Sequence, residues 1–424
     1  MTDSHSTSER PRALLVGCYL RAPDLPACKE HLEELSRLLD TYGVDTAAAE
    51  PCSLRTIDRA TYIGKGRLTE LKAVADALDV DAVIWDEELA PSQQRNLEKF
   101  FGRDVLERRE VILGVFQQHA RTKEAHLQVE LARIRYELPR LKNLWTHLSR
   151  QRGGGGLAVK GEGEKQIELD RRMLTDKAAH LTRQLKEVRR HRKTQRQARE
   201  RAGIPTFAIV GYTNAGKSTL LNALTQAGVL VEDQLFATLD TTTRKYTLPN
   251  NQEILLIDTV GFIRKLPHQL VAAFKSTLEE AVHADILLHV IDASSPVAHE
   301  QGAATLEVLK ELGAAGKPTL TLLNKCDQAD RGMLLRLRTL HSKTVQISAK
   351  EGTGFDDLTA RMVDELAALR QEVHVRIPQS EYALVSELIR SGEVLEQDYE
   401  ENDVVLHIRI PRGLARKVES YAIP

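Results

Sequence analysis

A glycine-rich segment with the pattern G-x-x-x-x-G-K-S could bind a nucleotide phosphate group. It follows an apolar run, Thr206–Val210, that predicts a buried strand, and it leads into a predicted helix. Main-chain N–H groups of such a loop close around phosphates, and the helix N-terminus adds a positive field. The Lys217 ammonium should reach the β- and γ-phosphates, and the Ser218 hydroxyl should coordinate Mg²⁺. The predicted phosphate site comprises Gly211, Tyr212, Thr213, Asn214, Ala215, Gly216, Lys217, Ser218 and Thr219.

A second segment has the acidic and glycine residues that a magnesium-bound triphosphate requires. The apolar run Ile254–Ile257 predicts a strand, and it is followed by Asp258, Thr259, Val260 and Gly261. A carboxylate at a strand end can hold Mg²⁺ through a water molecule. A glycine three residues later can offer its N–H to the γ-phosphate. A D-x-x-G pattern alone is common, but its position after the glycine-rich loop makes it informative.

Two further motifs indicate which base is bound. The predicted strand Thr319–Leu323 is followed by Asn324, Lys325, Cys326 and Asp327. The Asp327 carboxylate can accept hydrogen bonds from guanine N1–H and the N2 amino group, whereas adenine would leave it poorly paired. The run Val345–Ile347 leads to Ser348, Ala349 and Lys350, and the Ala349 N–H suits guanine O6. The four motifs together predict a site for GTP and GDP.

The order of the four motifs resembles that of the TRAFAC P-loop GTPases, and other segments resemble the HflX family in particular. One such segment lies between the first two motifs and consists of Phe236, Ala237, Thr238, Leu239 and Asp240. The others lie upstream: Tyr62-Ile-Gly-Lys-Gly66, Ala125-His-Leu-Gln-Val-Glu-Leu131, Leu138-Pro-Arg-Leu141 and Gln166-Ile-Glu-Leu-Asp-Arg-Arg172. The resemblance implies an Mg²⁺-dependent GTPase that binds the large (50S) ribosomal subunit. It also implies that the protein splits or rescues ribosomes, and that the ribosome stimulates its GTP hydrolysis.

The resemblance also implies roles for individual residues. Thr238 would be the switch threonine that joins Mg²⁺ beside Ser218 when GTP is bound, and Asp258 would hold the ion through water. Lys217, Thr238 and Gly261 would be the catalytic residues. The chain departs from the family pattern at two places. Gly161–Glu164 reads G-E-G-E where the hairpin loop usually has glycine-proline-glycine-glutamate, and Thr241 stands where proline is common.

Phe262 follows the D-x-x-G motif at the position where Ras-like enzymes have a glutamine. A phenyl ring cannot form a conventional hydrogen bond to the attacking water. Slow intrinsic hydrolysis and dependence on an external activator are therefore expected. A Phe262 side chain that only packs in the core predicts the same deficit.

Two other sites have more than one interpretation. The Asn214 oxygen could face a potassium ion beside the phosphates, although a hydrogen bond that stabilises the loop is the simpler interpretation. The Gly64-Lys65-Gly66 turn precedes a predicted helix and could hold a phosphate of ATP, but a structural turn is the simpler interpretation here too.

The pattern of elements predicts four domains, at residues 1–122, 123–202, 203–370 and 371–424. The first is a small α/β domain, with strands at Ala13–Leu20 and Asp81–Asp86 and helices at Leu25–Leu39 and Ser92–Phe101. The second is an antiparallel helical hairpin, kinked at Pro139, with a glycine-rich tip at Gly153–Gly156. Its apolar seams are Leu127, Leu131, Ile134, Leu138, Leu141, Trp145 and Leu148, and then Leu174, Ala178, Leu181, Leu185 and Val188. The third is a P-loop GTPase domain with a mostly parallel, doubly wound sheet. The fourth is a small α+β module that ends in a helix.

A basic run on the second hairpin helix suggests an RNA contact. Residues 171 to 201 have a net charge of +9, from 12 basic and 3 acidic residues. A charge run alone usually indicates a solvated face, but this excess has one sign. The aromatic content is only 4%, so contact with the phosphate backbone of structured RNA is favoured over base stacking. The candidate RNA-binding residues are Arg189, Arg190, Arg192, Lys193, Arg196 and Arg199.

The composition favours a cytoplasmic protein that does not insert into membranes. The chain has 424 residues, a net charge of -1 and 42% hydrophobic residues. Its four cysteines are widely spaced, which indicates neither a zinc site nor a disulfide framework. We expect a monomer that associates with ribosomes. Two alternatives remain: a GTP-regulated RNA-binding or RNA-modification factor, and a regulator that binds proteins through its hairpin.

Overall fold

The chain divides into two compact units in the computed structural model, and each unit is described by itself. The structure describes residues 10–141, 160–201, 204–225, 236, 242–265, 280–400, 402–415 and 417–423. The first unit comprises Met1–Lys186, Asp233–Leu239 and Lys265–Phe274. The second comprises Glu187–Glu232, Asp240–Arg264 and Lys275–Pro424.

The first unit is built on a parallel sheet of four strands in the order β2-β1-β3-β4. The strands are β1 (Arg12–Tyr19), β2 (Asp45–Ser53), β3 (Ala82–Trp85) and β4 (Asp104–Glu107). The helices that connect and follow them are α1 (Leu25–Tyr42), α2 (Lys65–Ala77), α3 (Pro91–Phe101) and α4 (Arg108–His119). Fully buried side chains such as Leu14, Val16 and Trp85 hold helices onto this sheet. The predicted small α/β domain is confirmed.

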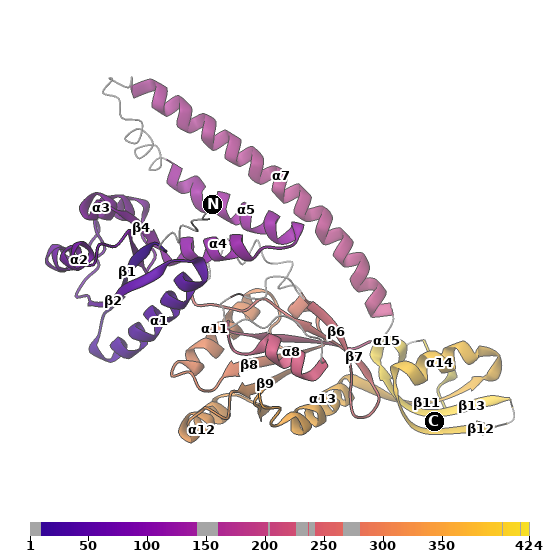
Figure 1. Cartoon of the computed structure of the whole chain (residues 1–424). Coiled ribbons are helices and arrows are strands. Elements are labelled where there is room, and N and C mark those ends of the chain that lie inside the picture. Colours follow the sequence, from indigo (N-terminus) through magenta and orange to yellow (C-terminus); the bar gives the residue numbers. More distant parts are fainter. Residues whose placement is uncertain are drawn as a thin grey trace, which may run out of the picture. The chain divides into compact units, whose positions relative to one another are not determined.

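Two helices follow this sheet and pack against each other. They are α5 (Lys123–Glu137) and α7 (Lys160–Arg201), and Figure 1 shows them side by side. Leu127, Leu131 and Ile134 of α5 form one apolar cluster with Leu181 and Leu185 of α7. The two predicted seams therefore pack against each other. Trp145, Leu148 and the Gly153–Gly156 tip lie outside the described residues.

Pro139 ends a helix, as its chemistry predicts. Helix α5 stops at Glu137, and a 3₁₀ turn, η2 (Leu138–Arg140), contains the proline. The G-E-G-E segment was wrongly assigned to the hairpin loop, because Gly161–Glu164 lies in the first turns of α7. Every residue of this segment has an N–H, and acidic residues suit the positive end of a helix, so the helix can begin at Lys160.

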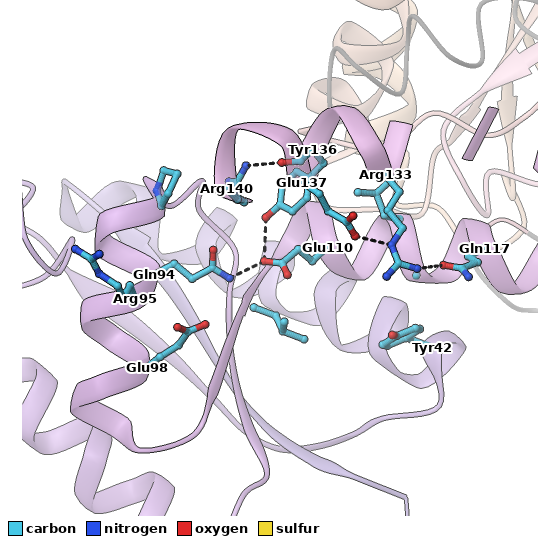
Figure 2. A pocket seen from close by; sticks show the side chains of 14 residues that line it. Tyr42, Gln94, Arg95, Glu98, Glu110, Gln117, Arg133, Tyr136, Glu137 and Arg140 are labelled. Atoms are coloured by element: carbon cyan, nitrogen blue, oxygen red, sulfur yellow. Dashed lines mark hydrogen bonds and ion pairs between the residues drawn. The ribbon is translucent and has the colours of Figure 1, made fainter. Parts of the chain in front are cut away.

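A group of buried charges joins α5 to the N-terminal sheet. Figure 2 shows Tyr136 of α5 hydrogen-bonded to Glu110 of α4, which also accepts from Gln94 of α3. The Tyr136 hydroxyl also lies 2.8 Å from the Glu107 carboxylate, and the Arg140 guanidinium lies 3.8 Å from the Tyr136 ring centre. Burial raises the pKa of both Glu107 and Glu110. A cavity of about 290 Å³ lies among these three helices.

The second unit contains a six-stranded sheet in the order β10-β9-β8-β5-β7-β6. Its pairs are parallel except β6 with β7. The strands are β5 (Thr206–Gly211), β6 (Thr242–Thr247), β7 (Glu253–Asp258), β8 (Ile286–Asp292), β9 (Thr319–Asn324) and β10 (Thr344–Gln346). The helices are α8 (Lys217–Thr225), α11 (Ala298–Glu311), α12 (Arg331–Leu340) and α13 (Phe355–Leu369). Because the central strands are parallel, the segments that follow them meet at one sheet edge.

The chain ends in a three-stranded antiparallel sheet in the order β11-β13-β12. Its elements are β11 (Arg370–Pro378), α14 (Tyr382–Ser391), β12 (Glu393–Glu400) and β13 (Asp403–Pro411). Val375, Leu388 and Leu406 belong to its buried cluster. The predicted final helix is only one turn, α15 (Arg412–Ala415). The predicted fold class, with a mostly parallel GTPase sheet between two smaller modules, is confirmed. Within the described ranges, every helix is too short or too polar to span a membrane.

Candidate nucleotide-binding site

The glycine-rich loop lies between β5 and α8, as the sequence predicted. Lys217 is the first residue of α8 and is 6% exposed, and its Nζ donates to the Tyr212 carbonyl at 2.8 Å. Burial lowers the Lys217 pKa to about 8, against the opposing effect of Asp258. Gly216 has a φ of +93°, and a Cβ there would lie 2.2 Å from Asn324 Nδ2. Only glycine fits this turn, which opens the amides ahead of α8 toward a ligand.

Ser218 and Asp258 form an oxygen-rich pair that fits a magnesium ion. The Ser218 hydroxyl donates to Asp258 Oδ2 at 2.7 Å, and Asp258 is fully buried at the end of β7. Hard oxygen donors such as these are what Mg²⁺ requires. When Mg²⁺ is bound with a nucleotide, the Ser218 hydroxyl would coordinate it directly and the Asp258 carboxylate would hold it through a water molecule. The ion would neutralise charge on the phosphates.

The segment after Asp258 is bound to the glycine-rich loop by main-chain hydrogen bonds. The Phe262 N–H donates to the Gly211 carbonyl at 3.0 Å, and the Thr213 N–H donates to the Phe262 carbonyl at 2.7 Å. A Cβ on Gly261 would lie 2.9 Å from Lys217 Nζ. Glycine at 261 therefore lets the D-x-x-G segment approach the lysine that would bind phosphate.

Asn324 connects the glycine-rich loop to the third and fourth motifs. Its Nδ2 donates to the Ala215 carbonyl at 2.7 Å, and its Oδ1 accepts from the Ala349 N–H at 2.9 Å. The residue is 2% exposed, at the end of β9. The buried Asn324 amide thus holds the glycine-rich loop, at Ala215, in a fixed position relative to the base-side loop, at Ala349.

Asp327 and Ser348 lie together where the base is expected. A hydrogen bond from the Ser348 side chain is the main cause that lowers the Asp327 pKa, so the carboxylate is favoured. Lys350 is exposed, and Ala349 is buried. A carboxylate kept ionised can accept two guanine N–H groups.

The sequence analysis missed Asp292, which positions Lys325. Lys325 has a φ of +58°, and its Nζ lies 2.7 Å from Asp292 Oδ2. Asp292 ends β8, and in the parallel register it pairs with Asn324 at the end of β9. An acidic residue at the end of the neighbouring buried strand was the available signal.

The switch and RNA-binding candidates are only partly described. Phe236 belongs to the first unit, where its ring centre lies 4.4 Å from that of Phe116. Ala237, Thr238, Leu239 and Asp240 lie outside the described residues. The six RNA-binding candidates all lie on α7, and Arg190 is exposed. Gly64 precedes α2 as its cap residue.

The family models that match this chain agree with this geometry. Three family models match in succession: "GTP-binding GTPase N-terminal" at residues 29–117, "GTP-binding GTPase Middle Region" at 119–199 and "50S ribosome-binding GTPase" at 206–325. A solved GTP-binding protein from Sulfolobus solfataricus, in complex with GDP, is 28% identical. The match covers 84% of this chain and 98% of that one, with a TM-score of 0.42.

Curated relatives match over nearly the whole length. GTPase HflX from Chlamydia pneumoniae is 47% identical over 420 residues, which cover 97% of this chain and 89% of the relative. GTPase HflX from Escherichia coli K12 is 40% identical over 386 residues, which cover 90% of each chain. The identity extends over nearly the whole chain. The glycine-rich loop, the Ser218–Asp258 pair and the Asp327 carboxylate also follow one another in the order that the sequence motifs predicted. The chain belongs to the HflX family of P-loop GTPases.

Proposed function

We propose that this GTPase binds GTP with Mg²⁺ through the four motifs and acts on the large ribosomal subunit. The Asn324 bridge between Ala215 and Ala349 is the observation that most supports the nucleotide site. The phosphate-binding residues are 211–219 and the base-side residues are Asn324, Lys325, Asp327 and 348–350. Residues 236–240 and 258–261 are the segments that respond to the γ-phosphate. Thr238 joins Ser218 on Mg²⁺, and Lys217, Thr238 and Gly261 serve hydrolysis.

Binding to the large subunit is supported by two features. The family model matched at residues 206–325 carries the description "50S ribosome-binding GTPase". The basic run on α7 supplies a single-signed charge suited to an RNA backbone. With Phe262 buried after Gly261, the chain has no glutamine there to orient water, so the ribosome completes the site and stimulates hydrolysis.

Single-turnover GTP hydrolysis with and without purified large subunits tests this function. We expect a slow rate for the protein alone and an increase of at least about tenfold with saturating large subunits. Small subunits serve as the control and should leave the rate unchanged. A fast rate without any partner, or equal stimulation by both subunits, would contradict the proposal.

The role of α7 is tested by neutralising its charge. Replacing Arg189, Arg190, Arg192 and Lys193 by glutamine should weaken cosedimentation with large subunits. The slope of log affinity against log salt concentration should become shallower, by an amount that corresponds to about four phosphate contacts at most. The matched control replaces the exposed Arg390 of α14 by glutamine and should bind normally. Salt-sensitive binding to any structured RNA, without preference for the subunit, would instead support an RNA factor not specific to ribosomes.

The finer consequences follow from ribosome binding. A factor of this kind is cytoplasmic, associates with ribosomes as a monomer, and separates subunits or rescues stalled ribosomes. Boundaries near residues 122, 202 and 370 would delimit its four functional parts. Sedimentation of whole ribosomes with the protein and a non-hydrolysable GTP analogue tests splitting, because free subunits should appear only when protein and analogue are both present.

A potassium ion beside the phosphates would be contacted by Asn214. Its φ of +59° lies in the left-handed region, which asparagine tolerates, so loop geometry alone also explains the residue. Hydrolysis measured in potassium and in sodium chloride distinguishes the two. A potassium effect that disappears in Asn214→Ala supports the ion, and equal rates in both salts reject it.

A further inference from the structure

Tyr212, the second residue of the glycine-rich loop, makes a contact that the four motifs do not account for. The Arg264 main-chain N–H donates to the Tyr212 hydroxyl at 2.6 Å. Tyr212 is 5% exposed, so this bond is formed inside the second unit, largely away from solvent. At the second position of a phosphate loop, the main chain rather than the side chain faces the phosphates. The tyrosine side chain therefore serves something other than phosphate binding.

Main-chain hydrogen bonds also bind the segment 261–264 to the loop. They join Phe262 to Gly211 and Thr213, next to the isolated bridge between Tyr212 and Phe262. Main-chain bonds of this kind do not depend on side-chain identity. The bond at the Tyr212 hydroxyl, in contrast, requires a side chain. It holds the main chain at Arg264, two residues after Phe262.

The position of this segment matters because Phe262 cannot orient water. Its ring is 1% exposed, and both its N–H and its carbonyl are committed to the loop. What remains to face a γ-phosphate is the main chain at Gly261, whose Cβ position would lie 2.9 Å from Lys217 Nζ. The location of the Gly261 N–H is then set by how firmly residues 262–264 are held. Preorganised main-chain donors of this kind contribute strongly to transition-state stabilisation.

We propose that Tyr212 is a positioning residue for GTP hydrolysis, whose hydroxyl fixes the Arg264 amide and so holds Gly261 in register with the γ-phosphate. GDP has no γ-phosphate, so its binding does not require this register. The inference rests on the proposed nucleotide site and is independent of ribosome binding. Loss of the hydroxyl changes hydrolysis and leaves GDP affinity unchanged.

The test compares Tyr212→Phe with Tyr246→Phe in the full-length protein. Tyr246 is a half-buried tyrosine of β6 and supplies a matched loss of one hydroxyl in the same sheet. We expect the single-turnover hydrolysis rate of Tyr212→Phe to fall about three- to tenfold, which is the change in rate that corresponds to the net free energy of one hydrogen bond. Its affinity for fluorescent GDP should stay close to that of the wild type, and its melting temperature should fall by a few degrees at most, because the Arg264 N–H loses its partner. Tyr246→Phe should hydrolyse GTP at the normal rate.

Two results would overturn the proposal. A Tyr212→Phe rate within twofold of the wild type means that the hydroxyl does not position the segment. A parallel loss of GDP affinity and hydrolysis means that it only supports the loop. If neither the wild type nor the variants bind GDP, the nucleotide site itself fails, and that result is separate from the failure of the positioning role.

Discussion

Replacing Asn324 by alanine should uncouple the phosphate side of the site from the base side. The change removes two buried hydrogen bonds, to the Ala215 carbonyl and from the Ala349 N–H. Each partner left unsatisfied in a buried place costs about 1–3 kcal/mol, so the total for two partners is about 2–6 kcal/mol. Part of this loss lowers the free energy of unfolding of the nucleotide-free protein. The other part weakens nucleotide binding, because a bound nucleotide requires both loops to be in place.

We expect about 2 kcal/mol of the loss to appear in binding, which corresponds to roughly a thirtyfold weaker affinity for GDP. Titration with a fluorescent GDP analogue measures the binding part, and urea unfolding of the nucleotide-free protein measures the remainder. Asn250→Ala is the control, because Asn250 is exposed in a turn and accepts a long, 3.3 Å bond from the Gln252 N–H. It should change both quantities little.

Asn324→Asp makes the test more stringent. An aspartate can still accept from the Ala349 N–H, but its second oxygen would face the Ala215 carbonyl, where the amide now donates. Two acceptors opposed in a buried place repel, so this variant should bind at least as weakly as Asn324→Ala. Near-normal GDP binding by either variant would refute the bridging role derived from the structure.

Four further changes have defined outcomes. Asp327→Asn should weaken GDP binding and favour xanthosine diphosphate, because the new amide can donate to the xanthine 2-oxo group; unchanged base preference in competition titrations would contradict the assignment. Ser218→Ala should weaken GTP binding about tenfold with Mg²⁺ but not with EDTA, because the Ser218 hydroxyl, 2.7 Å from Asp258, would be a direct ligand of the ion. Phe262→Gln should not accelerate single-turnover hydrolysis, because that side chain is buried, and burying an amide there should cost about 2–4 kcal/mol in urea unfolding. His289→Leu should remove a pH dependence: burial lowers the His289 pKa to about 3, so the unfolded chain binds the proton between about pH 6.5 and 3. Stability of the wild type should therefore fall by up to about 1.4 kcal/mol per pH unit as the pH drops below 6.5, with a smaller fall in the variant, where the nearby His341 remains.

The strands β1, β3, β5, β7 and β9 could be predicted because they are continuous apolar runs. β5, β7 and β9 are buried on both sides, and the motif residues follow each of them. The strand β2 was missed because D-T-A-A-A-E-P-C-S neither alternates nor forms an apolar run. It lies at the edge of its sheet, where Pro51 is tolerated. Edge strands show weaker patterns because one side of the strand has no partner.

A helix was expected after the Gly64-Lys65-Gly66 turn, but the bounds of α2 were not predicted, for a related reason. Its buried residues are only Leu68, Leu71 and Ala75, so its apolar stripe is narrow and the remainder is polar or small. The apolar seams of α5 and α7, in contrast, were found because they repeat over several turns. Seam periodicity does not fix where a helix starts, which is why Gly161–Glu164 was placed in the loop although it lies in α7.

The site residues that could be predicted are those whose side chains or glycine geometry are proposed to act on the ligand directly. Asp292 and the Tyr212 hydroxyl act on other protein groups, and only the sheet register shows which groups they reach. Asp292 meets Lys325 because β8 and β9 end level with each other. Tyr212 meets the segment after Phe262 because β5 and β7 are parallel neighbours whose chains continue side by side beyond the sheet.

This parallel continuation explains how a GTPase can have phenylalanine where a glutamine could orient water. Two neighbouring parallel strands that continue past the sheet edge can form hydrogen bonds, and here the Phe262 N–H and carbonyl do so while its ring is buried. A residue held in this way fixes the adjacent Gly261 main chain, but it leaves no side chain to activate water. In the proposed mechanism, positioning of Gly261 and activation of the attacking water are therefore separate tasks. The hydrogen bonds that position Gly261 lie within the second unit, and activation of the water is the task assigned to an external partner.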